Sequence, residues 1–310
     1  MREPRRTRTG SPPSDGDAEP DGQEKNNRGF GARLEFIQIN LHHSRAASAC
    51  LARNLGRLGQ GICLIQEPWS NNGVIRGLTG GQEALYVKGT GTPRACIWAS
   101  RGVNLWFWPH FSTKDLAVAM VTSGKKDIVV ASAYMPEGKR SGDPPPEEVR
   151  RLVEHCEEHD LALIIGTDSN CHHQAWGSKK TDRRGEELLA FLMSNNLGVV
   201  NEGNKPTFWS SRGNEVIDLT LATTGIIDNI QDWRVTEEQT LSDHRLIRFS
   251  MKDYVEQGQS ARRNVRHTDW GLFKKTLEEE LARRGRKEDV EGAVKDLNEA
   301  LKISFEQSTA

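Results

Sequence analysis

Apolar and polar positions divide the chain into an ordered middle and two polar flanks. Residues 1–33 contain almost no apolar side chain and mix arginines with prolines and acids. A segment of this kind buries too little apolar surface to offset the conformational entropy that is lost on ordering. We therefore predict a disordered tail over residues 1–33, with order beginning at Leu34.

Between residues 34 and 252, apolar runs of strand length alternate with segments of helical periodicity. Apolar residues at helical spacing predict helices within residues 44–58, 144–159 and 183–196. Short apolar runs between turn residues predict strands. These runs are LEFIQIN, GICLIQE, ALYVK, RACIWAS, NLWFW, LAVAMVTS, DIVVASAYMP, LALIIG, LGVV, EVIDLTLAT, IQDWRVT and RLIRFSM. Strands and helices mixed along one continuous domain are typical of an α/β fold.

The character of the sequence changes after residue 252. A polar stretch comes first, and two segments with apolar residues at helical spacing follow it, near residues 270–281 and 290–305. The apolar face of an amphipathic helix has to pack against a partner. We expect residues 253–310 to be a linker and amphipathic helices that lead into a downstream domain.

Composition and charge narrow the class of protein. The formal net charge of -1 over 310 residues excludes the overall basicity of a simple nucleic-acid coat protein. The five cysteines have no paired spacing, which indicates free thiols in a reducing compartment. The sequence contains neither an apolar stretch long enough to span a membrane nor a secretory signal segment. We expect a soluble, intracellular protein.

Polar side chains stand where the apolar strands end. Asn40 ends one strand, Glu67 follows another, and Tyr134 ends a third. Asp168 and Asn170 directly follow the apolar run LALIIG. Polar groups at strand ends of an α/β sheet meet at one rim, where ligands usually bind. We therefore predict a functional site at this rim.

Two acids and a histidine later in the chain complete the set. Asp218 lies inside the apolar strand EVIDLTLAT, where an aspartate is disfavoured unless it is paired. Asp243 and His244 precede the last strand of the domain. Hard oxygen ligands suit Mg²⁺ or Mn²⁺. A divalent cation, a base for water and a histidine that carries positive charge are the parts that phosphoester hydrolysis requires.

Zinc is the alternative raised by the consecutive residues Cys171, His172 and His173. Three consecutive side chains cannot all reach one ion without severe strain, and no second cysteine or histidine pair lies at zinc-finger spacing. We interpret these three residues as the start of a substrate-side loop.

The ordered motifs resemble a known family. QIN, LIQE, SAYMP, GTDSN, VIDLTL and SDHRLI occur in the order found in the exonuclease–endonuclease–phosphatase superfamily. More narrowly, they resemble the apurinic-endonuclease-like nuclease of non-LTR (LINE-type) retrotransposon polyproteins, over about residues 34–251. Thr167 stands where many relatives have glycine, but the spacing of the motif is unchanged. The segment HTDWGLFKKTLEEEL resembles the one that joins nuclease and reverse transcriptase in such polyproteins.

The resemblance implies a four-layer α/β sandwich, in which two mixed sheets pack face to face between helices, over residues 34–252. It also implies a Mg²⁺ site, with Mn²⁺ as a possible substitute. Glu67 would be the principal ligand of the metal, with Asn40 and Asp243 nearby.

The resemblance further assigns roles in catalysis. Asp168 would orient or deprotonate the attacking water, and Asn170 would hold that water or the phosphate. His244, kept protonated by Asp218, would stabilise charge on the phosphoryl oxygens. Tyr134 would contact the scissile phosphate or the leaving oxygen.

The implied reaction nicks one strand of double-stranded DNA and leaves a 3′-hydroxyl that primes reverse transcription. The implied partners are the DNA target, the element RNA and a reverse transcriptase domain, and the site of action is the nucleus, with no membrane involved. Basic loops can neutralise DNA phosphates. The residues expected to contact DNA are Lys179, Lys180, Arg183, Arg184, Trp176 and Thr207.

Other functions remain open at this stage. A phosphatase or an RNA-directed nuclease of the same superfamily would share the metal and histidine motifs. A domesticated copy that only binds DNA is a third alternative, although every expected catalytic side chain is present. The sequence contains no polymerase motif of a tyrosine followed by paired aspartates.

Overall fold

The computed structural model describes residues 33–89, 91–122, 127–138, 142–211, 213–252, 268–285 and 290–308. Apart from Arg33, the predicted N-terminal tail lies outside the described residues, and so does the stretch 253–267 of the predicted linker.

The first of two large sheets has five strands in the order β14-β15-β1-β2-β5. Strands β1 and β2 are parallel, and the other neighbours are antiparallel, so the sheet is mixed. Its strands are β1 (Leu34–Asn40), β2 (Gly61–Gln66), β5 (Ala95–Ala99), β14 (Ile230–Val235) and β15 (Ile247–Met251).

The second large sheet has six strands in the order β10-β13-β9-β8-β7-β6 and is also mixed, because β8 and β9 are parallel. Its strands are β6 (Leu105–Phe107), β7 (Leu116–Val121), β8 (Ile128–Tyr134), β9 (Ala162–Asp168), β10 (Leu197–Val199) and β13 (Asp218–Thr223). Two small hairpins add β3 (Ser70–Asn71) with β4 (Val74–Ile75), and β11 (Phe208–Ser210) with β12 (Gly213–Glu215).

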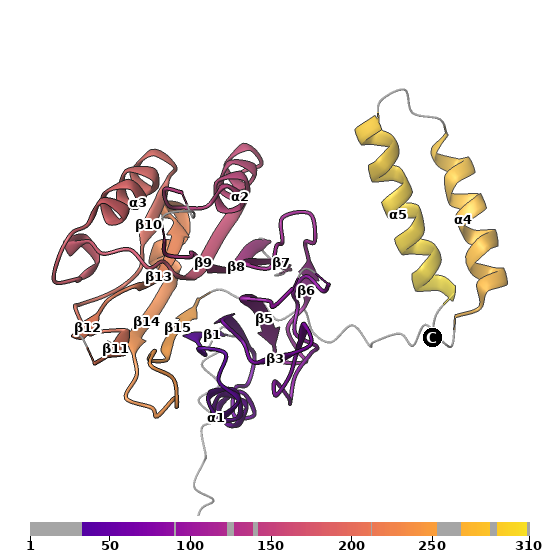
Figure 1. The fold of residues 1–310 in the computed structure, drawn as a ribbon. Coiled ribbons are helices and arrows are strands. Elements are labelled where there is room, and N and C mark those ends of the chain that lie inside the picture. The colour runs from indigo at the N-terminus through magenta and orange to yellow at the C-terminus, as the bar shows by residue number, and fades with distance from the viewer. Residues whose placement is uncertain are drawn as a thin grey trace, which may run out of the picture. The chain divides into compact units, whose positions relative to one another are not determined.

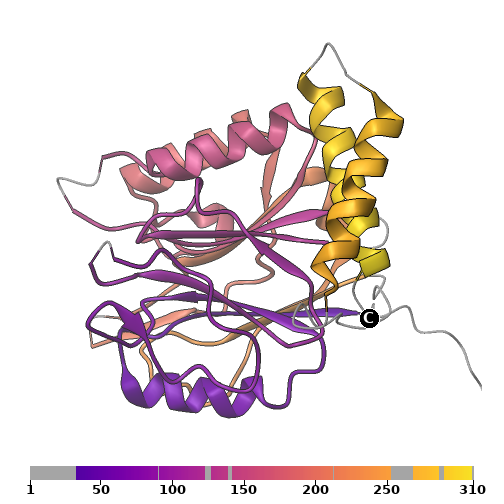
Figure 2. The same ribbon diagram turned by 90° about the vertical axis from the view of Figure 1, so that its right-hand side faces the viewer.

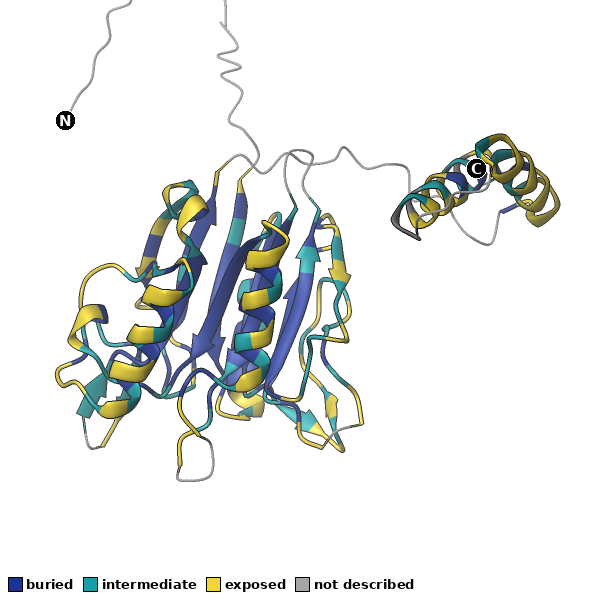
Figure 3. Ribbon diagram, turned by 90° about the horizontal axis from the view of Figure 1, so that it is seen from above, coloured by how far each residue is buried: buried dark blue, intermediate teal, exposed yellow. Residues whose placement is uncertain are grey.

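The two large sheets pack face to face, and helices cover their outer faces (Figures 1 and 2). Helix α1 (Arg45–Leu55) covers the first sheet, whereas α2 (Glu147–Glu158) and α3 (Arg183–Ser194) cover the second. The central strands of both large sheets are buried, while α2 and α3 expose their outer sides (Figure 3). The predicted four-layer α/β sandwich is therefore confirmed.

Strand alternation explains which side chains enter which layer. In β1, Phe36 packs between the sheets, whereas Ile37 and Ile39 pack against α1. The same period of two runs through β9, where Ile164 faces the other sheet and Ile165 faces the helices. Three apolar clusters result, one between the sheets and one beneath each helical layer.

The space between the sheets becomes polar toward one end. Gln38 donates from Nε2 to the carbonyl oxygens of Thr167 and Leu219, across the two sheets. Gln66 likewise donates to Gly166 O at 2.9 Å. Both amides are completely buried, so each needs these partners to offset the cost of desolvation. This layer of amides fixes how the two sheets meet just below the rim.

Gly166 allows the close approach at that layer. A Cβ atom at this position would lie 2.8 Å from Cδ1 of Leu64 and 3.0 Å from Cδ of Gln38, both on the opposite sheet. Only glycine therefore leaves room for Gln38 at this point in β9.

Helix starts follow local capping chemistry. Ser44 accepts from the N–H of Ala47 at the start of α1, and Asp182 accepts from Gly185 at the start of α3. Short 3-10 helices span Gln174–Trp176 and Thr224–Asn229. Of the strands predicted above, ALYVK is the exception, since it contributes only an isolated bridge from Leu85 to Ile97.

The C-terminal part forms a hairpin of two helices, as its periodicity predicts. Helix α4 (Trp270–Arg284) begins at the cap Asp269, and α5 (Val290–Ser308) packs against it. None of the described helices is both long and apolar enough to cross a membrane. All five cysteines are buried free thiols.

Candidate active site

The polar strand ends come together at one rim between the two sheets. Asn40 ends β1 in the first sheet, and Tyr134 and Asp168 end the parallel strands β8 and β9 in the second. Asp218 begins the antiparallel strand β13 directly beside Asp168. The predicted convergence is what the strand register produces, because Tyr134, Asp168 and Asp218 lie side by side across three strands.

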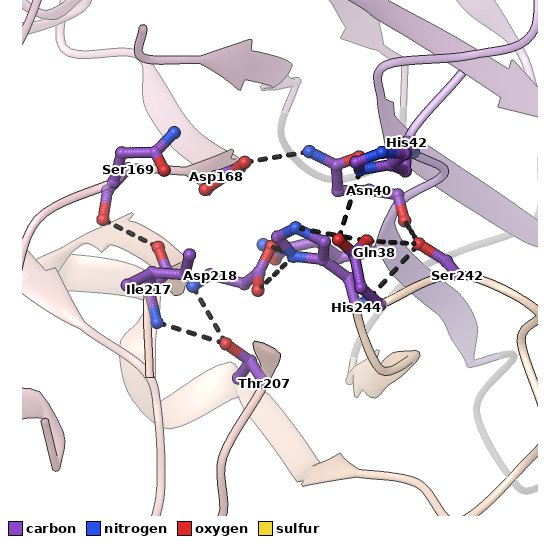
Figure 4. Close-up of polar contacts among 12 residues, drawn as sticks. Gln38, Asn40, His42, Asp168, Ser169, Thr207, Ile217, Asp218, Ser242 and His244 are labelled. Carbon is purple, nitrogen blue, oxygen red and sulfur yellow. Dashed lines mark hydrogen bonds and ion pairs between the residues drawn. The ribbon is translucent and has the colours of Figure 1, made fainter. Parts of the chain in front are cut away.

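A hydrogen bond joins the two sheets at this rim. Nδ2 of Asn40 donates to Oδ2 of Asp168 at 2.8 Å, and both side chains are buried (Figure 4). The N–H of His42 donates to Oδ1 of Asn40 at 2.7 Å. The two contacts assign the orientation of the Asn40 amide, with its NH₂ group toward the carboxylate.

Asp218 and His244 form a buried pair. Nδ1 of His244 lies 2.8 Å and 3.1 Å from the two carboxylate oxygens of Asp218. Burial alone would lower the pKa of His244, but the charge and hydrogen bond of Asp218 outweigh it, and the pKa rises to about 9. His244 is therefore an imidazolium at neutral pH, with Nδ1 occupied and Nε2 available to another group.

The surroundings of Asp168 favour its neutral form, whereas those of His244 favour the charged form. Burial raises the pKa of its carboxyl to about 7, and the neighbouring charge of Asp218 adds to this effect, whereas His244 opposes it. Its Oδ2 accepts from Asn40, but Oδ1 is buried and has no hydrogen-bond partner among the described residues. A buried acceptor without a partner is costly. The atom is therefore aimed at a place where water or a ligand belongs.

Glu67 follows β2 in a strained, left-handed conformation with φ +44°. Its carboxylate lies 3.5 Å from Nε2 of His43 and is 16% exposed, so it remains accessible to an ion. Burial raises the pKa of Glu67, but the hydrogen bond and charge of His43 outweigh it, and the pKa falls below its ordinary value. Glu67 is thus ionised at neutral pH.

Tyr134 lies near the carboxylates of Glu67 and Asp168 and the guanidinium of Arg94. Burial raises the pKa of its hydroxyl to about 12, and the negative charges of Glu67 and Asp168 add to this. The tyrosine is therefore a hydrogen-bond donor at neutral pH. The guanidinium of Arg94 stacks 4.6 Å above its ring, and Arg94 makes two 2.6 Å hydrogen bonds to Asp115.

The remaining two predicted residues lie at the edge of the same rim. Asp243 is partly exposed, with Oδ2 3.2 Å from Nδ1 of His42 and Oδ1 4.0 Å from Nε2 of His244. Asn170 is half-buried, adopts φ +47°, and donates from Nδ2 to Met135 O. All eight residues predicted to be catalytic therefore occupy this rim.

Part of the chain is similar in sequence to known proteins. A family model described as "Endonuclease-reverse transcriptase" matches residues 128–248. A curated relative from Bradysia coprophila, the retrovirus-related Pol polyprotein from type-1 retrotransposable element R1, is 31% identical over 126 residues. That match covers 36% of this chain but only 12% of the relative, so the chain spans a small part of the relative's length.

Two solved structures have a fold similar to that of this chain. The endonuclease domain of TRAS1, a telomere-specific non-LTR retrotransposon, is 27% identical with a TM-score of 0.60, covering 71% of this chain and 99% of that one. Part of this chain is thus similar to apurinic-endonuclease-like nuclease domains of the exonuclease–endonuclease–phosphatase superfamily. An AP endonuclease from Leishmania major, 12% identical with a TM-score of 0.57, shares the fold over 71% of this chain and 88% of its own.

The rim offers two groups of metal-binding atoms. Ligand atoms of Asp168, Asp218 and His244 all lie within 4.8 Å of one another. The hydrogen bond between Asp218 and His244 already uses Nδ1, so this group is better suited to move protons than to enclose a cation. Glu67 is a partly exposed carboxylate beside the amide of Asn40, and this oxygen-rich donor set fits a divalent cation.

Two of the residues predicted to contact DNA are buried. Trp176 is only 2% exposed and packs in the cluster beneath α2 and α3, with its indole donating to Cys171 O. Thr207 is fully buried, and its hydroxyl accepts from the backbone N–H groups of Ile217 and Asp218. Thr207 therefore positions Asp218 from behind, rather than touching a phosphate.

The predicted basic contacts divide into two kinds. Arg184 donates to three backbone carbonyls of the neighbouring loops, and Arg183 is bound to Asp143 at 2.6 Å. Lys179 and Lys180 are exposed, and neither forms an ion pair with another described residue. Within the part of the chain that the structure describes, these two lysines are the exposed cations of the loop that lack an acidic partner.

Cys171, His172 and His173 do not share a ligand. The Cys171 thiol is buried and donates to Ser169 O, while Nδ1 of His172 lies 3.5 Å from Glu215. His173 accepts from the N–H of Ala175 and caps the short helix that follows. The interpretation of this segment as a loop, rather than a zinc site, agrees with these three separate environments.

Sequence reasoning missed three side chains of the rim. Arg94 and Asp115 support Tyr134, and His43 contacts Glu67. The available signals were the arginine that begins RACIWAS, an acid just before LAVAMVTS, and the two histidines after QIN. None of these signals is specific until the strands are placed in space.

Proposed function

We propose that this chain is a Mg²⁺-dependent endonuclease that nicks one strand of double-stranded DNA. The nick would leave a 3′-hydroxyl, which primes reverse transcription when an element copies itself into its target. The similarity to the R1 polyprotein and to the TRAS1 endonuclease domain supports DNA as the substrate and a polyprotein as the context. Element RNA and a reverse transcriptase domain would then be partners, and the nucleus would be the site of action.

The observation that carries the proposal is the free Oδ1 atom of Asp168 beside the Asp218–His244 pair. One carboxylate with an open acceptor and one imidazolium at a single rim provide a base and a cation. Attack of water on a phosphodiester needs both, because a proton leaves the nucleophile while negative charge grows on the phosphate.

Each side chain has a step that its environment suits. Asp168 takes the proton of the attacking water, and its pKa of about 7 makes it a stronger base than an ordinary aspartate. His244 donates from Nε2 to a phosphoryl oxygen and remains protonated through its bond to Asp218. Tyr134 donates its hydroxyl to the phosphate or the leaving oxygen.

Glu67, with Asn40 and Asp243 nearby, would hold the divalent cation. When bound, such an ion neutralises charge on the phosphate and assists departure of the 3′-oxygen. The side chains that receive the DNA backbone would be Lys179 and Lys180, where phosphate contacts add affinity without reading sequence.

Nicking of supercoiled plasmid in Mg²⁺ tests the proposal. We expect open-circular product from the native protein and at least about a hundredfold less from Asp168→Ala or His244→Ala, the usual scale for loss of an acid or base. Asp228→Ala is the matched control, because Asp228 is exposed on the 3-10 helix after the far end of β13. An inert plasmid together with hydrolysis of lipid or sugar phosphates would replace the proposal with a phosphatase.

A further inference from the structure

We propose that His43 is a direct ligand of the cation bound by Glu67, which gives the site an imidazole nitrogen beside its carboxylate. Such a site favours Mn²⁺ and Zn²⁺ over Mg²⁺ more than an all-oxygen site does. The inference rests on the proposed function, because Glu67 is the metal ligand there.

His43 and Glu67 are joined before any ion binds. The backbone N–H of His43 donates to Glu67 O at 2.8 Å, which ties the loop after β1 to the residue after β2. Both residues adopt left-handed backbone conformations, with φ +50° and φ +44°. Non-glycine residues in this region are strained, and such strain gathers at ligand-binding positions. The fold therefore holds two strained residues in contact at the same rim.

The contacts of the His43 ring define which nitrogen is free. Nδ1 lies 3.2 Å from Pro68 O. A carbonyl oxygen only accepts, so Nδ1 carries the proton. Nε2 lies 3.5 Å from Oε1 of Glu67. A proton on Nε2 hydrogen-bonds to Glu67 when no ion is bound, and a cation that displaces this proton meets a lone pair on Nε2. Metal-binding histidines show this same arrangement, with one ring nitrogen donating to a carbonyl and the other facing the metal.

The spacing of the two atoms fits a shared ion. Two ligands that each lie about 2.1 Å from one cation, at the angles of octahedral or tetrahedral coordination, are about 3.0 to 3.4 Å apart. The separation of 3.5 Å between Nε2 and Oε1 is close to this range. Without a cation or an added proton, two acceptors face each other. The side chains of His43 and Glu67 are 40% and 16% exposed, so an ion can reach both from solvent.

The imidazole changes which cation the site prefers. Mg²⁺ favours oxygen ligands, whereas imidazole suits the later divalent transition ions and raises their affinity in the usual order. His43 therefore should add little to Mg²⁺ binding and much to Mn²⁺ or Zn²⁺ binding. The ratio of the Mn²⁺ affinity to the Mg²⁺ affinity therefore tests whether His43 is a ligand more directly than nuclease activity does.

Metal binding to the full chain without DNA provides the test. His43→Asn removes Nε2, but asparagine tolerates a left-handed conformation and keeps an N–H near the Pro68 carbonyl. We expect the Kd for Mn²⁺, measured by calorimetry, to rise at least about tenfold. The Kd for Mg²⁺ should change by less than about threefold. His110→Asn, at an exposed histidine between β6 and β7, is the control and should change neither.

A spectroscopic measurement separates a ligand from a neighbour. Electron spin echo modulation of bound Mn²⁺ should show a directly coordinated imidazole nitrogen in the native protein and in His110→Asn, and none in His43→Asn. Absence of that signal in the native protein, with an unchanged Mn²⁺ to Mg²⁺ affinity ratio in His43→Asn, overturns the inference.

Glu67→Gln distinguishes this failure from failure of the proposed function. If Glu67→Gln loses Mn²⁺ binding while His43→Asn retains the native affinity ratio, only the role of His43 is wrong. If Glu67→Gln also binds Mn²⁺ as the native protein does, the metal site itself lies elsewhere and both proposals fall.

Discussion

Nδ1 of His244 lies 2.8 Å from Oδ2 of Asp218, and both side chains are almost completely buried between the two sheets. The contact joins the residue that precedes the last strand of the first sheet to the first residue of β13 in the second. Burial strengthens the pairing because few waters screen it. The protonation state of His244 therefore depends on the packing of the two sheets, which brings Asp218 next to it.

Asp218→Asn should make activity fail as the pH rises. The negative charge of Asp218 keeps the pKa of His244 near 9 in spite of burial. Without that charge, burial is opposed only by the charges of Asp168 and Asp243, and the pKa of His244 falls. We expect the alkaline limb of the kcat profile to move to lower pH, with a loss of about a hundredfold at pH 8. The loss should shrink toward pH 6, and an equal loss at every pH would contradict the pairing.

Asp168→Asn should raise stability while it removes activity. The pKa of Asp168 is raised to about 7 in the folded protein, so its contribution to stability is complete below the unfolded value and is lost as pH rises through about 7. Asparagine cannot ionise and avoids that loss. We expect a Tm at least about 2 °C higher at pH 8 and a smaller gain at pH 5, measured by calorimetry. A lower Tm at pH 8 would show that the ionised carboxylate stabilises the fold.

Thr207→Val should weaken both folding and catalysis. The Thr207 hydroxyl accepts from the N–H groups of Ile217 and Asp218, and valine leaves both donors buried without a partner. The free energy of unfolding should fall by about 1–3 kcal/mol in urea titrations. Thr207→Ser keeps the acceptor and is the matched control. If valine and serine behave alike, the hydroxyl does not position Asp218.

Replacing Lys179 and Lys180 with alanine should weaken DNA binding without changing the chemical step. Both side chains are exposed cations on the loop after β9. Loss of each phosphate contact should reduce the slope of log K against log salt by about 0.9 for duplex DNA. Binding titrations at several salt concentrations and single-turnover rates check this, with Lys252→Ala as the control. An unchanged salt slope would place the DNA elsewhere.

The sequence was a good guide where residues lie in regular strands. The period of two and the strand boundaries predict that Asn40, Tyr134 and Asp168 share a rim, because register in a sheet carries residues to the same edge. The same logic explains why Asp218, an acid inside an apolar strand, needed a partner. His244 is that partner.

Loops and contacts between sheets could not be predicted in this way. Trp176 and Thr207 sit in segments that read as polar surface, yet tertiary packing buries them. The ion pair of Arg94 with Asp115 joins residues on different sheets. Their separation in the sequence gives no indication of this contact. The contact of His43 with Glu67 depends on the position of the loop after β1 in the folded protein, which the sequence alone does not give.

The chemistry of the nicked end tests the central claim most directly. Supercoiled plasmid is incubated with the protein and Mg²⁺, and the open-circular product is offered to a DNA polymerase with labelled nucleotides, with no prior phosphatase treatment. Hydrolysis through Asp168 and His244 predicts immediate extension from a free 3′-hydroxyl, and no extension after incubation with Asp168→Asn. A nick that is extended only after a 3′-phosphate has been removed would contradict the account.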